Sequence, residues 1–286
     1  FVKYQDKTGL GRWIFDHMGT TPVLMSSVNG ETRAKVATNL LRDYGYFNGS
    51  VSYREVPQKD PKKAKVSYVV DMANPYLLDS IAYLRYPVVA DSLIQHTRQE
   101  SVLKSGENFS VIKLEEERQR LSTLFRNHGY YYYRPEFTTF RADTLQKSGY
   151  VSLQVVPKTG IPSEAKRQYH IGNTSVYLTG YNDEPPTDTL RLRTMTLYYS
   201  GKKPGIRPSA LMRNFFFRKG ELFSQDRQTF TQEAIARMGV FRYSEFRYAL
   251  KDTTAGCDTL NVNMYATFDK PYKAELELNV TNKSTD

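Results

Sequence analysis

The chain has 286 residues, of which 40% are hydrophobic and 24% charged, a composition typical of globular domains with modest cores. No apolar run approaches the ~18 residues that a membrane-spanning helix needs, and a single cysteine, Cys257, excludes an internal disulfide framework. Lys and Arg exceed Asp and Glu by ten charges, and this surplus suits anionic partners such as a lipid headgroup surface or a nucleic acid.

The pattern of apolar residues predicts an alternation of amphipathic helices and short strands. Runs rich in β-branched and aromatic residues predict the strands, and polar segments with Gly and Pro separate them. In chain order, the predicted elements are a helix ending at Gly45, strands at 51–55, 64–70 and 80–84, a helix ending at Gly129, strands at 136–140, 150–156 and 175–178, a helix ending at Gly239, and strands at 243–250 and 260–267.

The three glycines indicate an internal repeat. Each follows an amphipathic segment, at a position where a helix ends and where glycine adopts the left-handed conformation without steric cost. An aromatic residue follows two positions later and is placed to pack back on the last helical turn; the three are Phe47, Tyr131 and Phe241.

A second repeated element is the pattern G-E-x-F-S, which occurs at 106–110 and 220–224. We expect Gly106 and Gly220 to form a turn, and Ser110 and Ser224 to cap the helix that follows. The aromatic residues of the pattern are expected in the core; they are Phe109 and Phe223. The first copy lacks this element.

The repeated unit is strand–helix–helix–strand–strand. Together with the G-E-x-F-S turns and the helix end Asn127-His128-Gly129-Tyr130, it resembles the POTRA domains, the polypeptide-transport-associated repeats of the BamA/TamA superfamily. The resemblance implies an α+β fold of tandem POTRA-like domains, each with a three-stranded mixed sheet and two helices on one face. We place these domains at 1–76, with its first strand truncated, at 77–168 and at 169–271.

The tail at 272–286 alternates apolar and polar residues over much of its length, as a barrel strand does with one face to lipid and one to the lumen. In the family, the last POTRA domain leads directly into the barrel. We therefore expect these residues to begin the first strand of a C-terminal β-barrel in the same full-length chain; an ordinary edge strand is the alternative. The resemblance implies a periplasmic location, attached to the outer membrane of a Gram-negative bacterium through that barrel.

The resemblance implies that the chain binds unfolded outer-membrane or secreted polypeptides by β-augmentation, in which an extended chain adds itself to a sheet edge. Periplasmic or lipoprotein accessory subunits are further expected partners, and the scattered Lys and Arg suit an anionic membrane surface. The expected edge is the strand after the second helix of each repeat, with client-binding residues Val51, Tyr53, Phe137, Thr138, Thr139, Tyr243 and Phe246. A BamA-like and a TamA-like role stay open.

Two other function classes were weighed: a structural arm without client handling, and a basic nucleic-acid-binding module. The Tyr130–Tyr133 cluster would suit base stacking, but it follows a helix-ending glycine and begins a strand, which favours packing. No H-E-x-x-H, C-x-x-C or G-x-S-x-G motif occurs, and the four histidines are far apart in sequence. We therefore expect no catalytic residue, metal or cofactor, and no nucleic-acid partner.

Overall fold

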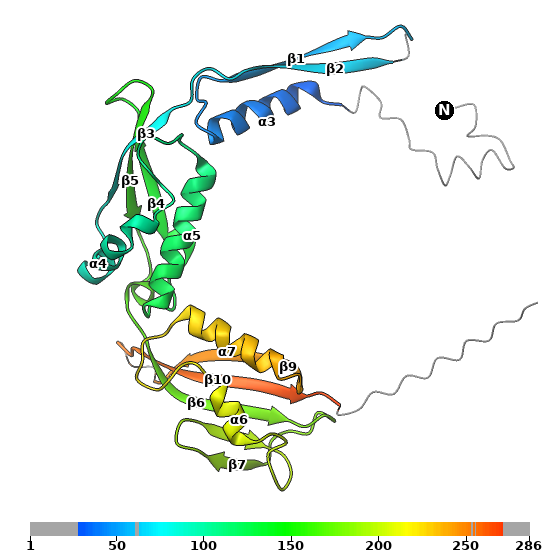
Figure 1. The fold of residues 1–286 in the computed structure, drawn as a ribbon, viewed down its shortest axis with the longest axis vertical. Coiled ribbons are helices and arrows are strands. Elements are labelled where there is room, and N and C mark those ends of the chain that lie inside the picture. The colour runs from blue at the N-terminus through cyan, green and yellow to red at the C-terminus, as the bar shows by residue number, and fades with distance from the viewer. Residues whose placement is uncertain (1–27, 61–62, 253, 255, 271–286) are drawn as a thin grey trace, which may run out of the picture. The chain divides into compact units, whose positions relative to one another are not determined.

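The computed structural model describes residues 28–60, 63–252, 254 and 256–270 (Figure 1). The predicted first strand of the chain and the predicted tail strand at 272–286 lie outside these residues. The chain divides into two compact units, which are described separately. The first is formed by Phe1–Ala82, Ser101–Glu117 and Phe140–Val155, and the second by Tyr83–Glu100, Arg118–Thr139 and Val156–Asp286.

The described part of the first unit begins with helix α3 (Gly30–Asp43) and a two-stranded antiparallel sheet. The Asn29 side chain accepts a hydrogen bond from the Thr32 amide at 2.9 Å and so caps the first turn of α3. The strands are β1 (Ser50–Pro57) and β2 (Ala64–Asp71), close to the predicted bounds.

A three-stranded sheet has the order β3-β5-β4, with β3 at Leu77–Tyr83, β4 at Thr138–Asp143 and β5 at Tyr150–Pro157. Between β3 and β4 the chain forms α4 (Val88–His96) and α5 (Val111–Asn127). The order β3–α4–α5–β4–β5 confirms the predicted strand–helix–helix–strand–strand unit.

Helix α5 has the apolar stripe that its sequence predicts, because Leu121 and Phe125 are fully buried. One acidic residue of this helix is also buried. Glu117 accepts hydrogen bonds from the Ser101 hydroxyl at 3.2 Å and from the Val102 amide at 3.1 Å, which compensate for the burial of its carboxylate.

The second unit contains a five-stranded mixed sheet with the order β7-β8-β6-β10-β9. The central pair, β6 (His170–Thr179) and β10 (Thr259–Phe268), is parallel, and β9 (Phe241–Leu250) joins β10 antiparallel. The added strands β7 (Asp188–Arg191) and β8 (Thr196–Tyr199) form an antiparallel pair at the other side.

Two helices cover one face of this sheet, α6 (Pro208–Arg213) and α7 (Gln225–Arg237) (Figure 1). Leu211 of α6 and Ile235 of α7 belong to one buried core that also contains Val176, Leu197 and Met264 from three strands. Ser224 accepts from the Arg227 amide at 3.4 Å, which confirms the predicted cap of α7. Three short 3-10 helices complete the elements: η2 (Arg98–Glu100), η3 (Pro135–Phe137) and η4 (Ser163–Lys166).

The α+β class is confirmed, but three details of the sequence analysis are wrong. The last sheet has five strands rather than three, because β7 and β8 were not predicted. Phe137 does not lie in a strand: Pro135 favours a tight helical turn at η3, and β4 begins only at Thr138. Phe230, Ile235 and Met238 have the spacing that predicts one apolar face of α7, but Phe230 is exposed.

Candidate binding surfaces

Strand β9 forms an edge of the five-stranded sheet. It pairs with β10, and no other strand in the described part of the chain pairs with its second side. The Lys251 amide donates to the Thr259 carbonyl at 2.9 Å, so 251 and 259 form a hydrogen-bonded pair. Because such pairs alternate along an antiparallel ladder, the N–H and C=O groups of Ser244, Phe246 and Tyr248 point away from β10.

The two predicted client-binding residues of β9 face opposite sides of the sheet. The Phe246 ring packs toward the helices, with its centroid 5.8 Å from that of Phe215 and 6.3 Å from that of Phe217. Tyr243 is exposed, and its hydroxyl donates to the Glu245 carboxylate at 2.8 Å. Phe246 therefore anchors the strand, while its backbone groups remain on the open edge.

Charged side chains lie along the face of β9 rather than across its edge. Glu245 accepts a hydrogen bond from Arg247 at 2.7 Å, and the Arg247 guanidinium lies 5.0 Å from the centroid of the Tyr265 ring on β10. The hydrogen bonds from Arg247 and from Tyr243 lower the pKa of the Glu245 carboxyl. These contacts hold Arg247 over the sheet, and this leaves the backbone edge accessible.

The predicted edge on β4 is partly occupied. The Phe137 carbonyl accepts from the Lys158 amide at 2.8 Å, and the Thr138 carbonyl accepts from Arg118 Nε at 3.1 Å. Thr138 is buried, and Thr139 is half-buried. The Phe137 carbonyl is paired on the side of β5, the strand that Lys158 follows, and a client chain could not use the Thr138 carbonyl without displacing Arg118.

The predicted edge on β1 is partly covered by its own helix. The Val51 amide donates to the Thr38 hydroxyl of α3 at 3.0 Å. The Tyr53 ring lies directly against Gly30, where a Cβ atom would collide with it. Of the three predicted edge strands, β9 is therefore the longest, with ten residues, and its outer edge is the least covered by other groups.

The repeat signature residues form a defined junction in the first unit, which we call the first junction. The Tyr76 amide donates to the Gly45 carbonyl at 2.8 Å, and the Phe109 amide donates to the Tyr76 carbonyl at 2.9 Å. The Leu78 amide donates to the Glu107 carbonyl at 2.8 Å, and the Gly106 amide donates to the Leu78 carbonyl at 2.7 Å. The G-E-x-F-S turn thus pairs with the start of β3. Phe47 packs on Tyr76 and Phe109, with centroid distances of 5.0 and 5.2 Å.

The second unit repeats these four backbone hydrogen bonds, and we call this set the second junction. Their donor and acceptor pairs are Tyr169 to Gly129, Phe223 to Tyr169, Ile171 to Glu221 and Gly220 to Ile171, each at 2.8 Å. Tyr131 takes the place of Phe47, and its ring centroid lies 4.9 Å from that of Phe223. The aromatic residue that follows the glycine therefore packs on the next G-E-x-F-S turn, not simply on its own helix as the sequence suggested.

The third glycine has no such partner among the described residues. Gly45, Gly129 and Gly239 have φ values of +89°, +95° and +64°, which confirms the predicted left-handed conformation. A Cβ at Gly239 would meet no atom within 4 Å. Phe241 begins β9, and its ring centroid lies 5.1 Å from that of Phe268.

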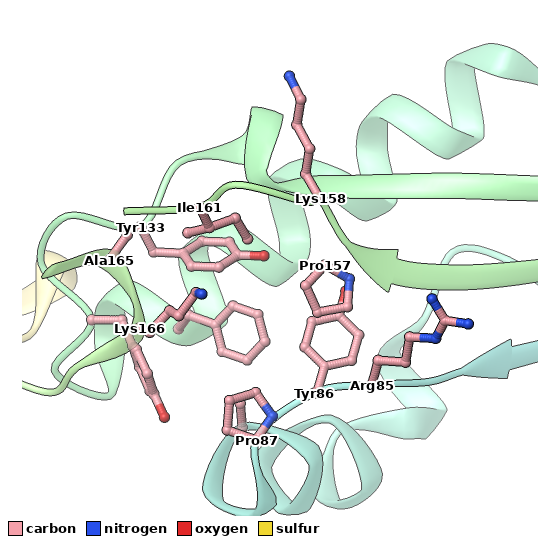
Figure 2. Close-up of a pocket in the computed structure, with 12 residues that line it drawn as sticks. Arg85, Tyr86, Pro87, Tyr133, Pro157, Lys158, Ile161, Ala165 and Lys166 are labelled. Carbon is pink, nitrogen blue, oxygen red and sulfur yellow. The ribbon is translucent and has the colours of Figure 1, made fainter. Parts of the chain in front are cut away.

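A partly open aromatic cavity of about 210 Å³ lies beside α4 in the second unit (Figure 2). Buried Phe125, Tyr130 and Tyr133 line it, and burial raises the pKa of Tyr133 to about 12. Figure 2 shows Lys166 extended toward the rings, whereas Lys158 points away from them. The cavity is therefore mainly a gap between packed rings, with Lys166 extended toward them.

The described residues contain no group of three or more His, Cys, Asp or Glu side chains that could hold a metal ion. His96 and His128 each donate a ring N–H to a carbonyl of their own helix, Ser92 at 2.6 Å and Leu124 at 2.7 Å.

Among the described residues, no helix combines the length and the apolar character needed to cross a membrane.

The sequence matches no protein-family model and no curated protein. Solved structures with similarity to this chain include POTRA regions of BamA and Omp85. BamA POTRA3-5 of Haemophilus influenzae is 12% identical, with a TM-score of 0.43, over 93% of each chain. BamA of Haemophilus ducreyi lacking POTRA domains 1-3 is 13% identical, with a TM-score of 0.47, over 68% of this chain and 29% of that one. The N-terminal domain of Omp85 of Thermosynechococcus elongatus is 16% identical, with a TM-score of 0.29, over 91% of this chain and 92% of that one.

Proposed function

We propose that this chain is the periplasmic, POTRA-like region of an outer-membrane β-barrel protein that assembles or translocates other polypeptides, and that it acts by binding rather than catalysis. The sequence repeats, the strand–helix–helix–strand–strand order and the two matching junctions support this proposal. We retain the predicted domains at 1–76, 77–168 and 169–271, and a barrel that begins in 272–286.

The observation that carries the function is the open edge of β9. An extended client chain could form main-chain hydrogen bonds with the outward groups of Ser244, Phe246 and Tyr248. Main-chain pairing is insensitive to client sequence, which suits a protein that handles many unfolded chains. Phe246 holds the strand against the core, so the edge is ordered before a client arrives and less entropy is lost on binding.

A proline substitution tests the edge. Ser244→Pro removes an N–H group that points away from β10, so it leaves the β9–β10 ladder intact. Ser244→Ala keeps that N–H group and is the matched control. Binding is measured by fluorescence anisotropy with a labelled outer-membrane barrel protein diluted from urea.

We expect Ser244→Pro to weaken binding about fivefold to tenfold, which corresponds to one or two lost hydrogen bonds, and Ser244→Ala to bind like the parent chain. Near-ultraviolet circular dichroism checks that both variants fold. Equal binding by all three proteins would contradict β-augmentation at β9. No binding by the parent chain would favour a structural arm without client handling.

A further inference from the structure

A groove of about 870 Å³ lies on the second unit, away from the backbone edge of β9. The turn between β7 and β8, helix α6 and the segment after α6 border it. Its floor is apolar. Met195 and Phe217 are buried there, and Met212 and Phe215 are half-buried. The volume is in the range of ~300–1,000 Å³ that is usual for ligand-binding clefts.

The rim of this groove is cationic. Arg193, Arg213 and Arg218 are exposed, and no Asp or Glu is among the residues that line the groove. No salt bridge found in the described part of the chain uses these three side chains. Glu221 accepts a hydrogen bond from the Arg218 amide at 3.2 Å, but its carboxylate is paired with Arg227.

The groove is built partly by an insertion, β7 and β8, which the basic repeat lacks, and partly by α6, the first of the two repeat helices. Residues 181–218 include β7, β8 and α6, and they carry seven Lys and Arg against three Asp and Glu. Asp183, one of these three acids, is paired with Arg242 of β9. The insertion and the α6 region that follows it therefore gather part of the positive surplus of the chain around an apolar floor.

We propose that this groove binds an acidic amphipathic segment of a partner polypeptide, with carboxylates on the arginines and apolar side chains on the floor. The inference rests on the proposed binding function but uses a different surface from the β9 edge. Guanidinium groups match carboxylates in a bidentate geometry, which a lysine cannot provide. Methionine side chains adapt to different apolar partners, and they suit a floor that receives more than one sequence.

The shape of the site favours a peptide over a membrane. Met195 and Phe217 of the floor are buried, whereas the three arginines are exposed, so a side chain inserted between the arginines reaches the floor more readily than a flat bilayer surface does. The floor also has a firm support, because the rings of Phe215 and Phe217 pack on Phe246 of β9. Aromatic anchors in such supported pockets commonly contribute most of the binding energy at protein interfaces.

The test uses the whole chain and a labelled peptide with glutamates on one helical face and leucines and phenylalanines on the other. A second peptide carries lysines in place of the glutamates. The variant Arg193→Glu/Arg213→Glu changes the groove, and Lys202→Glu/Lys203→Glu changes two exposed cations of the same insertion outside the groove. Both variants alter the net charge equally.

We expect the arginine variant to bind the acidic peptide about tenfold more weakly than the parent chain does. The lysine variant should bind it with an affinity within about twofold of that of the parent chain. The lysine peptide should not bind. Equal weakening by both double variants would overturn the proposal, because it would indicate general charge attraction. Binding of anionic phospholipid vesicles without binding of the peptide would also overturn it.

Ser244→Pro separates this proposal from the β9 edge. We expect this variant to bind the acidic peptide like the parent chain. Loss of peptide binding in Ser244→Pro, with no loss in the arginine variant, would place the peptide on β9; the groove proposal would then fail and the proposed function would stand. If the unfolded client failed to bind while the acidic peptide bound normally, the proposed function would fail and the groove proposal would stand.

Discussion

The first and second junctions have the same backbone hydrogen bonds but different side-chain surroundings. At the first junction, the atoms nearest to a Cβ placed on Gly45 are the carbonyl oxygens of Phe109 and Tyr76. At the second, the nearest atom to a Cβ on Gly129 belongs to the Leu222 side chain, at 2.9 Å. The repeat therefore preserves a backbone pattern, while each junction is stabilised by its own side chains.

The second junction also has additional side-chain hydrogen bonds. Asn127 Oδ1 accepts from the Asp226 amide at 2.9 Å and from the Ser224 hydroxyl at 3.3 Å. The Gln168 side chain donates to the His128 carbonyl at 2.8 Å. These contacts join the end of α5 to the start of α7. We therefore expect the second junction to tolerate the loss of any one contact better than the first.

The largest expected effect is that of Gly45→Ala. The new Cβ would lie 2.7 Å from the Phe109 carbonyl oxygen, and alanine is strained at a φ of +89°. Backbone strain and overpacking together should lower the free energy of unfolding of the first unit by about 3 kcal/mol. Urea denaturation measures this loss, and hydrogen exchange at the Tyr76 and Phe109 amides locates it. A loss of only about 1 kcal/mol would mean that the junction backbone yields easily.

Gly129→Ala should have a smaller effect, about 2 kcal/mol on the second unit. The left-handed strain is similar, but the colliding atom is the end of the Leu222 side chain, which can rotate away. Urea denaturation of both alanine variants under the same conditions gives the ranking. A larger loss for Gly129→Ala than for Gly45→Ala would contradict the difference between the junctions.

Asn127→Ala should lower the free energy of unfolding of the second unit by about 1.5 kcal/mol, because it removes the acceptor shared by Ser224 and Asp226. Hydrogen exchange measures this effect, and the Asp226 amide should exchange faster in the variant. Asp43 has the equivalent position before Gly45 and is exposed, so Asp43→Ala is the matched control, with an expected change below about 0.5 kcal/mol. Similar losses of stability in Asn127→Ala and Asp43→Ala would contradict the proposed difference between the two junctions.

Gly239→Ala isolates the backbone strain. Nothing lies within 4 Å of a Cβ at this position, and φ is +64°. Only the left-handed conformation opposes alanine here, so we expect a loss of about 1 kcal/mol in thermal or urea denaturation. A loss as large as that of Gly45→Ala would show that the collision at the first junction contributes little.

The smallest effect at neutral pH concerns two half-buried tyrosines, Tyr131 of the second junction and Tyr248, whose ring centroid lies 5.2 Å from that of Tyr131. Burial raises the pKa of Tyr131 and of Tyr248, so the folded chain favours their neutral forms. Their contribution to stability is complete below the ordinary tyrosine pKa of ~10 and is lost as pH rises through the higher folded values. Alkaline titration followed by phenolate absorbance should show these two ionising together with unfolding of the second unit. Ionisation of both tyrosines at the ordinary tyrosine pKa, without unfolding, would contradict this coupling between ionisation and unfolding.

The sequence predicted the repeated unit because its signals are local. The glycines end helices through their own backbone conformation, and Ser224 caps α7 through an amide three residues away. The partners of Phe47 and Tyr131 could not be predicted in the same way. Phe109 and Phe223 lie far along the chain, and only the folded backbone brings these rings together.

The binding surfaces were predicted less completely. The β9 edge was expected, but nothing in the sequence showed that Arg118 occupies the Thr138 carbonyl or that Thr38 occupies the Val51 amide. Strands β7 and β8 have only four residues each, too few for a clear alternation of apolar residues. The arginine groove depends on these strands, so it could not be recognised before the structure.

Residue-resolved hydrogen exchange on β9 tests the central claim most directly. In the free chain, the outward amides of Ser244, Phe246 and Tyr248 should exchange quickly, and the inward amides of Glu245 and Arg247 slowly. Addition of the unfolded barrel protein should slow exchange of the three outward amides and leave the inward ones unchanged. Unchanged exchange of the outward amides in a complex that does form would contradict client binding by β-augmentation at this edge.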